Sequence, residues 1–293
     1  MFRPLFVLIV VSLGLVSSLH AQLEVELKIS RRFYLAYEPV IATVTITNLA
    51  GRDLLLQDAE GQKWFSFTIV NGEQSPVGPR DSHYQVSPLT IQAGQTLKRT
   101  VNLNELYPIN DFGLYRVRAS IYFADMHKYF SSAPVGIEIS EGKLAWQQVV
   151  GVPEGQEGAG SYRVISLLTF RLPKENQLYV RIEDREAGII YCTHAIGRIL
   201  LAETPQAVLD LQNQVHLLQL VGPRIWAYTR VGLNGEILEQ TSYTQLKVAP
   251  HLKKLPNGNV IVAGGQVEAS KADTGLPASV QKLSDRPPGF PKN

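Results

Sequence analysis

The sequence predicts an all-β protein with two domains, and three observations support this prediction. From Gln22 to Ser140 hydrophobic and polar residues alternate with a period of two, which is typical of half-buried strands. The stretch 161–267 resumes this pattern after a glycine-rich interval. Hydrophobic residues make up 45% of the chain, which is enough to build two cores.

The first domain, residues 22–140, is predicted to be an antiparallel sandwich. In the segment 115–123, Tyr115, Val117 and Ala119 face inward, while the arginines between them face solvent. Short strands separated by turn signals, without helical stretches, favour a sandwich. The expected strands lie at 23–29, 40–47, 64–70, 115–123 and 135–140.

Residues 141–160 are interpreted as a linker between the domains. The last ten, "GVPEGQEGAG", contain four glycines and one proline but no aromatic residue. Such a composition has little to bury and breaks regular structure. The alternative is a long ordered loop inside a single domain.

The second domain, residues 161–267, is predicted to be antiparallel β-structure with a faint repeat. Segment 175–200 aligns with segment 212–238, and each begins at a polar turn and returns through an aromatic strand. A sandwich, a barrel and blade-like hairpins all remain open, whereas a closed propeller needs more residues. Hydrophobic spacing between residues 208 and 218 also fits a helix, although we favour strand.

The ends of the chain predict an exported protein with a tail. Arg3, an apolar run over 5–16 and small residues up to Ala21 form the pattern of a signal peptide cleaved after residue 21. An uncleaved N-terminal anchor is the alternative. The residue directly after the cleavage point is Gln22 and not a cysteine, so we expect a secreted or periplasmic protein that is not a lipoprotein. Residues 268–293 are rich in charges and prolines and predict a disordered tail.

Charge and cysteine content restrict the partners. A formal net charge of +2 with 18% charged residues is not the electrostatic pattern of a nucleic-acid-binding protein. Cys192 is the single cysteine, so no disulfide can form within the chain. With no Asn-x-Ser/Thr acceptor either, bacterial export is favoured, and the expected partner is another envelope or extracellular protein or a polysaccharide. No transmembrane segment is expected after signal removal.

Candidate catalytic and metal-binding residues are few, and none is predicted to act. Five histidines lie outside the signal and none has metal-ligand spacing: His83, His127, His194, His216 and His251. Cys192 and His194 would share a strand face, where a reactive pair is one interpretation and a buried cysteine the favoured one. The acidic cluster within 181–186 is interpreted as a charged hairpin turn. We therefore expect no catalytic residue, no metal and no cofactor.

Two aromatic pairs are candidates either for a ligand platform or for a core. Trp226 and Tyr228 lie two apart on one strand, next to Arg230. Exposed, they would form a ligand or sugar platform; buried, they would belong to the second core, which we favour. The same alternatives apply to Tyr34 and Tyr37.

The stretch "DFGLYRVRA" predicts a structural corner. In immunoglobulin-type sandwiches, the tyrosine of Asp-x-Gly-x-Tyr returns its hydroxyl to nearby backbone, and here Asp111, Gly113 and Tyr115 match this pattern. Val117 stands where a disulfide cysteine would lie. Its expected packing partner across the sandwich is Val44.

Five segments together resemble a known family. In order they are "TVTITN", "LLL", "FSFTIVNGE", "SPLTIQAGQTLKRTVNL" and "DFGLYRVRA". Over residues 40–123 the chain is similar to the bacterial intracellular proteinase inhibitor domain, and macroglobulin-type domains look much the same. The resemblance implies an immunoglobulin-like sandwich, and no inhibitory loop residue is carried over.

The function expected from the sequence is that of an exported, non-catalytic binding or structural protein. A proteinase-inhibitor-like binding protein and a hydrolase without a recognisable motif are the alternatives. The second domain resembles no family that we recognise.

Overall fold

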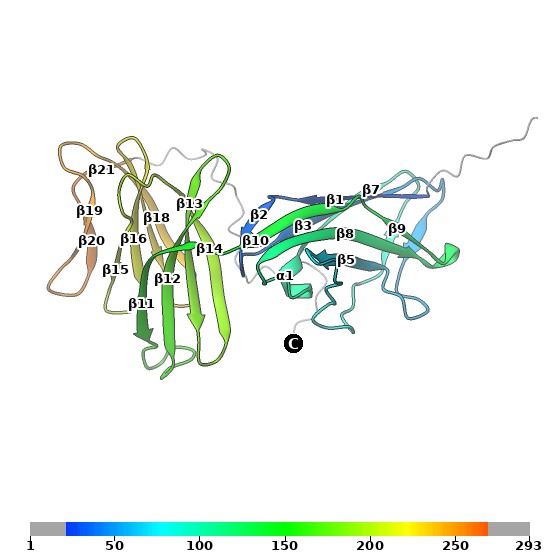
Figure 1. Cartoon of the computed structure of the whole chain (residues 1–293), viewed down its shortest axis with the longest axis horizontal. Coiled ribbons are helices and arrows are strands. Elements are labelled where there is room, and N and C mark those ends of the chain that lie inside the picture. The colour runs from blue at the N-terminus through cyan, green and yellow to red at the C-terminus, as the bar shows by residue number, and fades with distance from the viewer. Residues whose placement is uncertain (1–21, 269–293) are drawn as a thin grey trace, which may run out of the picture.

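The computed structural model describes residues 22–268, which form an all-β chain as predicted (Figure 1). Two β units lie side by side along the long axis of the molecule in Figure 1. The predicted signal peptide and the tail after Glu268 lie outside the described residues. Within 22–268, no helix is long and apolar enough to cross a membrane.

The first unit is a sandwich of two sheets. One sheet has the order β1 (Leu23–Ile29), β3 (Ile41–Asn48) and β7 (Thr96–Asn102). The other has the order β2 (Phe33–Leu35), β10 (Val135–Ser140), β8 (Gly113–Phe123) and β5 (Phe65–Asn71), with β9 (Lys128–Ser131) paired to β8. Neighbouring strands are antiparallel except that β2 runs parallel to β10. Four short elements complete the unit: β4 (Leu54–Leu56), β6 (Leu89–Ile91), the helix α1 (Leu103–Leu106) and the 3-10 turn η1 (Ala124–Met126).

One continuous hydrophobic cluster fills the space between these sheets. Along β3 every second residue is buried, because alternate side chains of a strand point to opposite faces. Val44 on β3 and Val117 on β8 are both 0% exposed within this cluster. Both valines that the sequence predicted to face the inside of the sandwich are therefore part of its core.

Two tyrosine hydroxyls form hydrogen bonds with backbone groups in the first sandwich. The hydroxyl of Tyr115 donates to the carbonyl oxygen of Asp111 at 2.9 Å, and Gly113 between them has a φ of 138° that favours glycine. The Tyr107 hydroxyl donates to the Phe67 carbonyl oxygen at 3.0 Å and accepts from the Phe67 N–H at 3.0 Å. The sequence pattern indicated the first of these contacts and not the second.

The second unit contains two further sheets and an outer hairpin. The first of these sheets has the order β11 (Lys143–Gly151), β12 (Tyr162–Arg171), β13 (Asn176–Asp184) and β14 (Ile189–Ile199). The other has the order β15 (Gln206–Leu209), β16 (Val215–Gly222), β17 (Ile225–Val231), β18 (Ile237–Thr244) and β21 (Gln266–Val267). The outer hairpin consists of β19 (His251–Lys254) and β20 (Val260–Ala263). The segment around residues 205–218 is strand, as favoured from the sequence.

The interpretation of residues 141–160 as a linker was wrong. Residues 143–151 form β11, which pairs antiparallel with β12, and the glycine-rich run is the loop that joins these two strands. The junction between the sandwiches is only Glu141 and Gly142. Because β11 is an edge strand with mostly exposed residues, its sequence lacks the alternation that revealed the other strands.

The second unit is layered around two clusters of its own. Residues of the two sheets, among them Ile165, Val180 and Leu217, pack together between the sheets. On the far side of β16 to β18, Trp226 and Tyr228 pack against residues that include the β19–β20 hairpin. The hairpin thus forms a third layer over the second sheet.

Candidate interdomain cleft

A buried hydrophobic contact joins the two sandwiches beside the short junction. Leu35, at the end of β2, packs with Leu168, Phe170 and Tyr179 of the second sandwich and is fully buried. A Cβ atom added at Gly142 would lie 3.0 Å from the Leu168 Cβ, so the chain passes this contact with little room. The two units therefore pack directly on one another.

Directional hydrogen bonds fix the orientation of this contact. Arg31 Nη1 donates to the Tyr179 hydroxyl at 3.0 Å, and the same guanidinium pairs with the buried carboxylate of Glu38. Arg181 Nη2 donates to the carbonyl oxygen of Ala36 at 2.6 Å. Because these bonds cross from one sandwich to the other, a rotation of either unit would break them.

A cleft of about 180 Å³ lies between the two sandwiches next to this contact. Figure 1 shows α1 and β14 on the sides of the two units that face each other. The lining residues of the first sandwich are Tyr37, Pro39, Arg80, Asn102, Asn104 and Asn110. Those of the second are Ile190, Tyr191, Cys192, Thr193 and His194, all on β14. Domain interfaces are a preferred place for binding sites.

Three asparagines form an ordered amide wall on the first sandwich. Asn104 Oδ1 accepts from the Val40 N–H at 2.8 Å, and Asn104 Nδ2 donates to Asn110 Oδ1 at 3.1 Å. Arg80 Nε donates to the Asn104 carbonyl oxygen at 2.9 Å. Asn102 caps α1 by accepting from the Asn104 N–H at 3.3 Å. Among the described residues, Asn110 Nδ2 makes no hydrogen bond, which leaves an amide donor for a ligand.

Tyr37 occupies the cleft in a strained backbone conformation. Its φ is 66° and its side chain is 42% exposed, although a left-handed conformation costs a tyrosine about 1–3 kcal/mol. The Arg181 guanidinium lies 5.5 Å from its ring centroid. Tyr34, by contrast, is fully buried in the first core. Of the two alternatives for these tyrosines, a core position is therefore correct for Tyr34, and an exposed position is correct for Tyr37.

Strand β14 forms the wall of the cleft on the side of the second sandwich, and those of its ionisable side chains that line the cleft are uncharged at neutral pH. Cys192 belongs to the second core and burial raises the pKa of its thiol to about 12. Desolvation lowers the pKa of His194 below its usual value, so its ring is neutral at neutral pH. Thr193 Oγ1 accepts from Arg181 Nε at 3.1 Å. Buried cysteine, the favoured interpretation of this pair, matches the structure.

Trp226 and Tyr228 do not form an exposed platform. They are 3% and 6% exposed, and the Tyr228 hydroxyl lies 2.8 Å from His216 Nδ1. Arg230 Nη2 lies 3.4 Å from a carboxylate oxygen of Glu239. The core interpretation is therefore the one that the structure supports, because the outer layer covers both rings.

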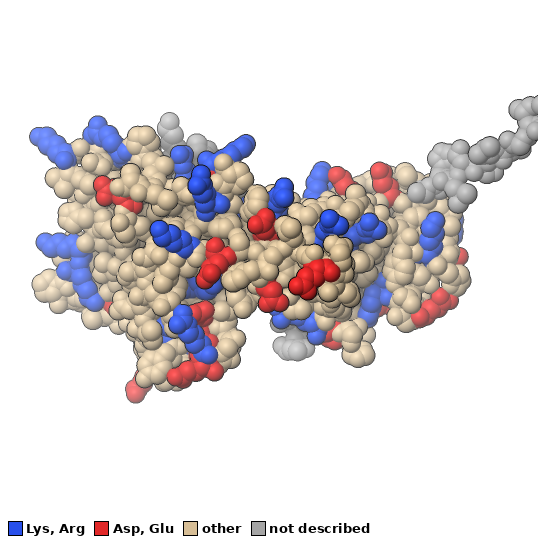
Figure 2. Space-filling view, viewed as in Figure 1, with Lys and Arg blue, Asp and Glu red and all other residues tan. Residues whose placement is uncertain are grey.

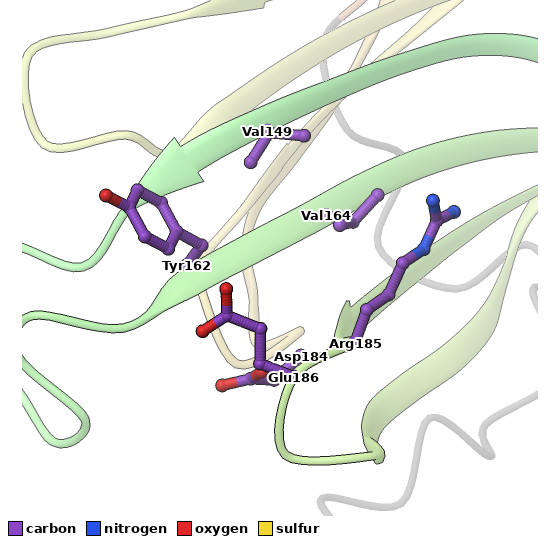
Figure 3. A pocket seen from close by; sticks show the side chains of 6 residues that line it. All are labelled: Val149, Tyr162, Val164, Asp184, Arg185 and Glu186. Carbon is purple, nitrogen blue, oxygen red and sulfur yellow. The ribbon is translucent and has the colours of Figure 1, made fainter.

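The acidic cluster within 181–186 includes a hairpin turn, as expected, and borders a separate depression. The depression has a volume of about 300 Å³ and is lined by Val149, Tyr162, Val164, Asp184, Arg185 and Glu186. Figure 3 shows Tyr162 and Arg185 at opposite ends with the two valines between them. All of these residues belong to the second sandwich. Within 22–268, no three His, Cys, Asp or Glu side chains are grouped to hold a metal ion.

Surface charge differs between the ends of the molecule. Figure 2 shows acidic and basic side chains interspersed over the first sandwich, whereas basic ones prevail at the far end of the second. That end includes the segment 245–267, which holds Lys247, Lys253 and Lys254 and no acidic residue. It lies away from the cleft, whose only lining side chain with a charge at neutral pH is Arg80.

Sequence reasoning did not identify the amide wall. Its residues come from the end of β7, a short helix and two loops, and no local motif connects Arg80 with the asparagines. The spacing of three asparagines between 102 and 110 was the available signal. It could not show which strand of the second domain would lie opposite.

Comparisons with known proteins give no family. No family model matches the chain, and no curated protein matches it. Among solved structures, the sporulation control protein Spo0M from Bacillus subtilis aligns with 12% identity and a TM-score of 0.29, covering 58% of this chain and 83% of its own. The periplasmic chaperone SfaE aligns with 13% identity and a TM-score of 0.23, covering 75% of this chain and 98% of its own.

Proposed function

We propose that this chain is an exported, non-catalytic binding protein whose two sandwiches hold one ligand between them. The observation that carries the proposal is the cleft to which both units contribute side chains. The hydrogen-bonded contact beside it keeps the two walls at a fixed separation, which reduces the ordering cost of binding.

The lining groups favour a polar ligand without a positive charge. They supply amides, a hydroxyl, the Arg80 guanidinium and the exposed ring of Tyr37, and no carboxylate lines the cleft among the described residues. The three asparagine Oδ1 atoms already accept hydrogen bonds, whereas Asn110 Nδ2 makes none among the described residues, so the wall suits a ligand that carries acceptor groups. Arg80 adds affinity for an acidic one.

The same groups favour binding over turnover. A thiol with a pKa of about 12 is not a nucleophile at neutral pH, and His194 has no carboxylate beside it in the cleft lining. In the usual arrangement of a nucleophile and its base, a third group such as a carboxylate orients the imidazole, and the described residues that line the cleft include no carboxylate. The proposal therefore gives the cleft a recognition role.

The test is ligand binding by a cleft variant against a matched surface variant. Mature chain 22–293 would be screened on glycan and peptide arrays, together with Tyr37→Asn and Tyr162→Asn. Asparagine tolerates the left-handed backbone at position 37, and Tyr162 is an exposed tyrosine that does not line the cleft. We expect binding to be lost in Tyr37→Asn and kept in Tyr162→Asn, with equal melting temperatures. Array binding that survives Tyr37→Asn combined with Asn110→Ala would overturn the proposal.

A further inference from the structure

We propose that the ligand of the cleft is an extended polypeptide segment of a partner, which pairs through its backbone with the edge of β14. This inference rests on the proposed function and specifies its ligand. Three features carry it: the position of β14 in its sheet, the unpaired groups along its edge, and the amide wall opposite.

Five consecutive residues of β14, from Ile190 to His194, line the cleft. Successive side chains of a strand point to opposite faces of the sheet, so five in a row cannot reach one cavity through their side chains alone. They share it through the backbone at the strand's edge. Because β14 is the last strand in the order β11–β12–β13–β14, that edge faces the cleft with no strand beside it.

The edge of β14 is closed at one end and open along the cleft. Beyond the cleft, Gln219 Nε2 donates to the Arg198 carbonyl oxygen at 3.0 Å, and the Leu200 N–H donates to the Leu220 carbonyl oxygen at 2.7 Å. Over residues 190–194, among the described residues, backbone groups bond only within the sheet, to β13. Alternate residues of an antiparallel edge strand direct their N–H and C=O groups outward. The pairing with β13 shifts register at Tyr191, so the regular unpaired row begins on the Cys192 side of this bulge.

The opposite wall offers a hydrogen-bond donor to the second edge of an added strand. A strand paired with β14 would lie about 4.8 Å from it and turn its other backbone groups toward Asn102, Asn104 and Asn110. Asn110 Nδ2 makes no hydrogen bond among the described residues, so it can donate to a C=O group of the peptide. The three Oδ1 atoms of this wall each accept a hydrogen bond already, so the N–H groups of the peptide find their acceptors on β14.

The length of the β14 stretch and the charge of Arg80 restrict which partner segments can bind. Five residues of β14 correspond to about 17 Å of strand, so four to six residues of the partner would be paired, about the length of an ordinary strand. Arg80 favours an acidic or uncharged segment over a basic one. The ring of Tyr37, held in place beside Arg181, offers one side-chain contact.

The experiment uses synthetic decapeptides selected on the mature chain, and the change is made in the peptide so that folding of the protein is not at issue. Peptides whose binding is lost in Tyr37→Asn and kept in Tyr162→Asn would be methylated at one backbone nitrogen at a time. Methylation removes one N–H donor, so we expect about three- to tenfold weaker binding at alternate positions and little change between them. This period of two is the signature of strand pairing.

Other outcomes separate the two proposals. Cleft-dependent peptides that tolerate methylation everywhere, or a cleft-dependent glycan in place of peptides, would overturn the strand-pairing inference and leave the binding function intact. The absence of any cleft-dependent binder would overturn both. A synthetic peptide of residues 269–293 belongs in the same series; if it alone binds with a period of two, the occupant is this chain's own tail and the inferred partner is wrong.

Discussion

The two sandwiches differ in how their buried surfaces are arranged. The first encloses a single continuous core. The second divides its hydrophobic residues among a core between its sheets, the contact with Leu35 of the first sandwich, and a cluster that includes the outer hairpin. The first unit thus gathers its core residues in one cluster and adds Leu35 to the contact between the units, whereas the second packs on the first unit on one side and under its own outer hairpin on the other.

Each unit buries a carboxylate that is paired with an arginine, and in the first unit this pair is Glu38 with Arg31. In the second sandwich Arg163 Nη1 lies 3.2 Å from Asp184 Oδ2, and both side chains are almost fully buried. The guanidinium also donates to Ser161 Oγ at 2.6 Å and lies 4.1 Å from the ring centroid of Tyr191. A Cβ at Gly158 would approach Arg163 Nη2 to 2.6 Å, so the glycine-rich loop closes over this arginine. An ion pair therefore orders the loop that the sequence alone presented as a linker.

The largest expected effect is on the alkylation rate of Cys192, the single thiol of the second sandwich. With a pKa of about 12, the thiolate fraction of Cys192 at pH 8 is about a thousandfold lower than that of an ordinary cysteine. Alkylation of the native protein, followed by mass spectrometry, should be slower by at least this factor than alkylation in denaturant. Because the first sandwich has no cysteine, the reaction also reports when the second unit unfolds. Equal native and denatured rates would contradict the burial.

Removing one partner of the buried ion pair comes next. Asp184→Ala leaves Arg163 charged and buried, and should lower the free energy of unfolding by about 3–5 kcal/mol in urea melts. The matched control is Arg163→Met combined with Asp184→Leu, which removes both charges and should come close to the stability of the unaltered chain. A cost below about 0.5 kcal/mol for Asp184→Ala would mean that the pair is solvated.

A hydroxyl placed in the first core should cost less. Val117→Thr keeps the shape of the side chain and buries a polar group, so we expect a loss of about 1–3 kcal/mol. Val149→Thr is the control, because Val149 is 58% exposed on an edge strand and should change by less than about 0.5 kcal/mol. Equal melts for the two variants would contradict the placement of Val117 at the centre of the sandwich.

The smallest effect is expected at the tyrosine corner. Tyr115→Phe removes the hydrogen bond to the Asp111 carbonyl oxygen and should cost about 0.5–1.5 kcal/mol. Tyr162→Phe serves as the control, since the Tyr162 side chain is exposed and its hydroxyl makes no hydrogen bond within the described residues. Guanidinium melts of both variants measure the difference, and its absence would remove any energetic role of the corner.

Periodicity predicted the strands that have one buried face and failed where burial is absent. Buried and less buried residues alternate strictly along β3, so this strand could be predicted from the sequence. Strand β11 is mostly exposed and pairs along one edge only, so nothing in its residues distinguished it from a linker. The same alternation predicted that Tyr115 and Val117 face inward. Their positions depend on contacts that lie near in the chain, as for Tyr115, or within one sandwich, as for Val117.

The cleft could not be predicted for a related reason. It depends on how the two units pack, which is decided by Leu35 and by hydrogen bonds that span about 150 residues of sequence, such as that from Arg31 to Tyr179. The exposure of Tyr37 and the burial of Trp226 follow from the same packing. The inhibitor-like resemblance, export and the absence of catalysis stay predictions.

The two-residue junction bears on how such a chain can change during evolution. Modules joined by long linkers are readily duplicated, permuted or transferred to new proteins, because each keeps its surface when moved. Here a recombination point at Glu141 or Gly142 would strip Leu35 of its cover, expose Phe170 and separate the two walls of the cleft. We therefore expect the two sandwiches to be inherited together. Homologous sequences should differ by substitutions along the cleft walls and not by exchange of one sandwich for another.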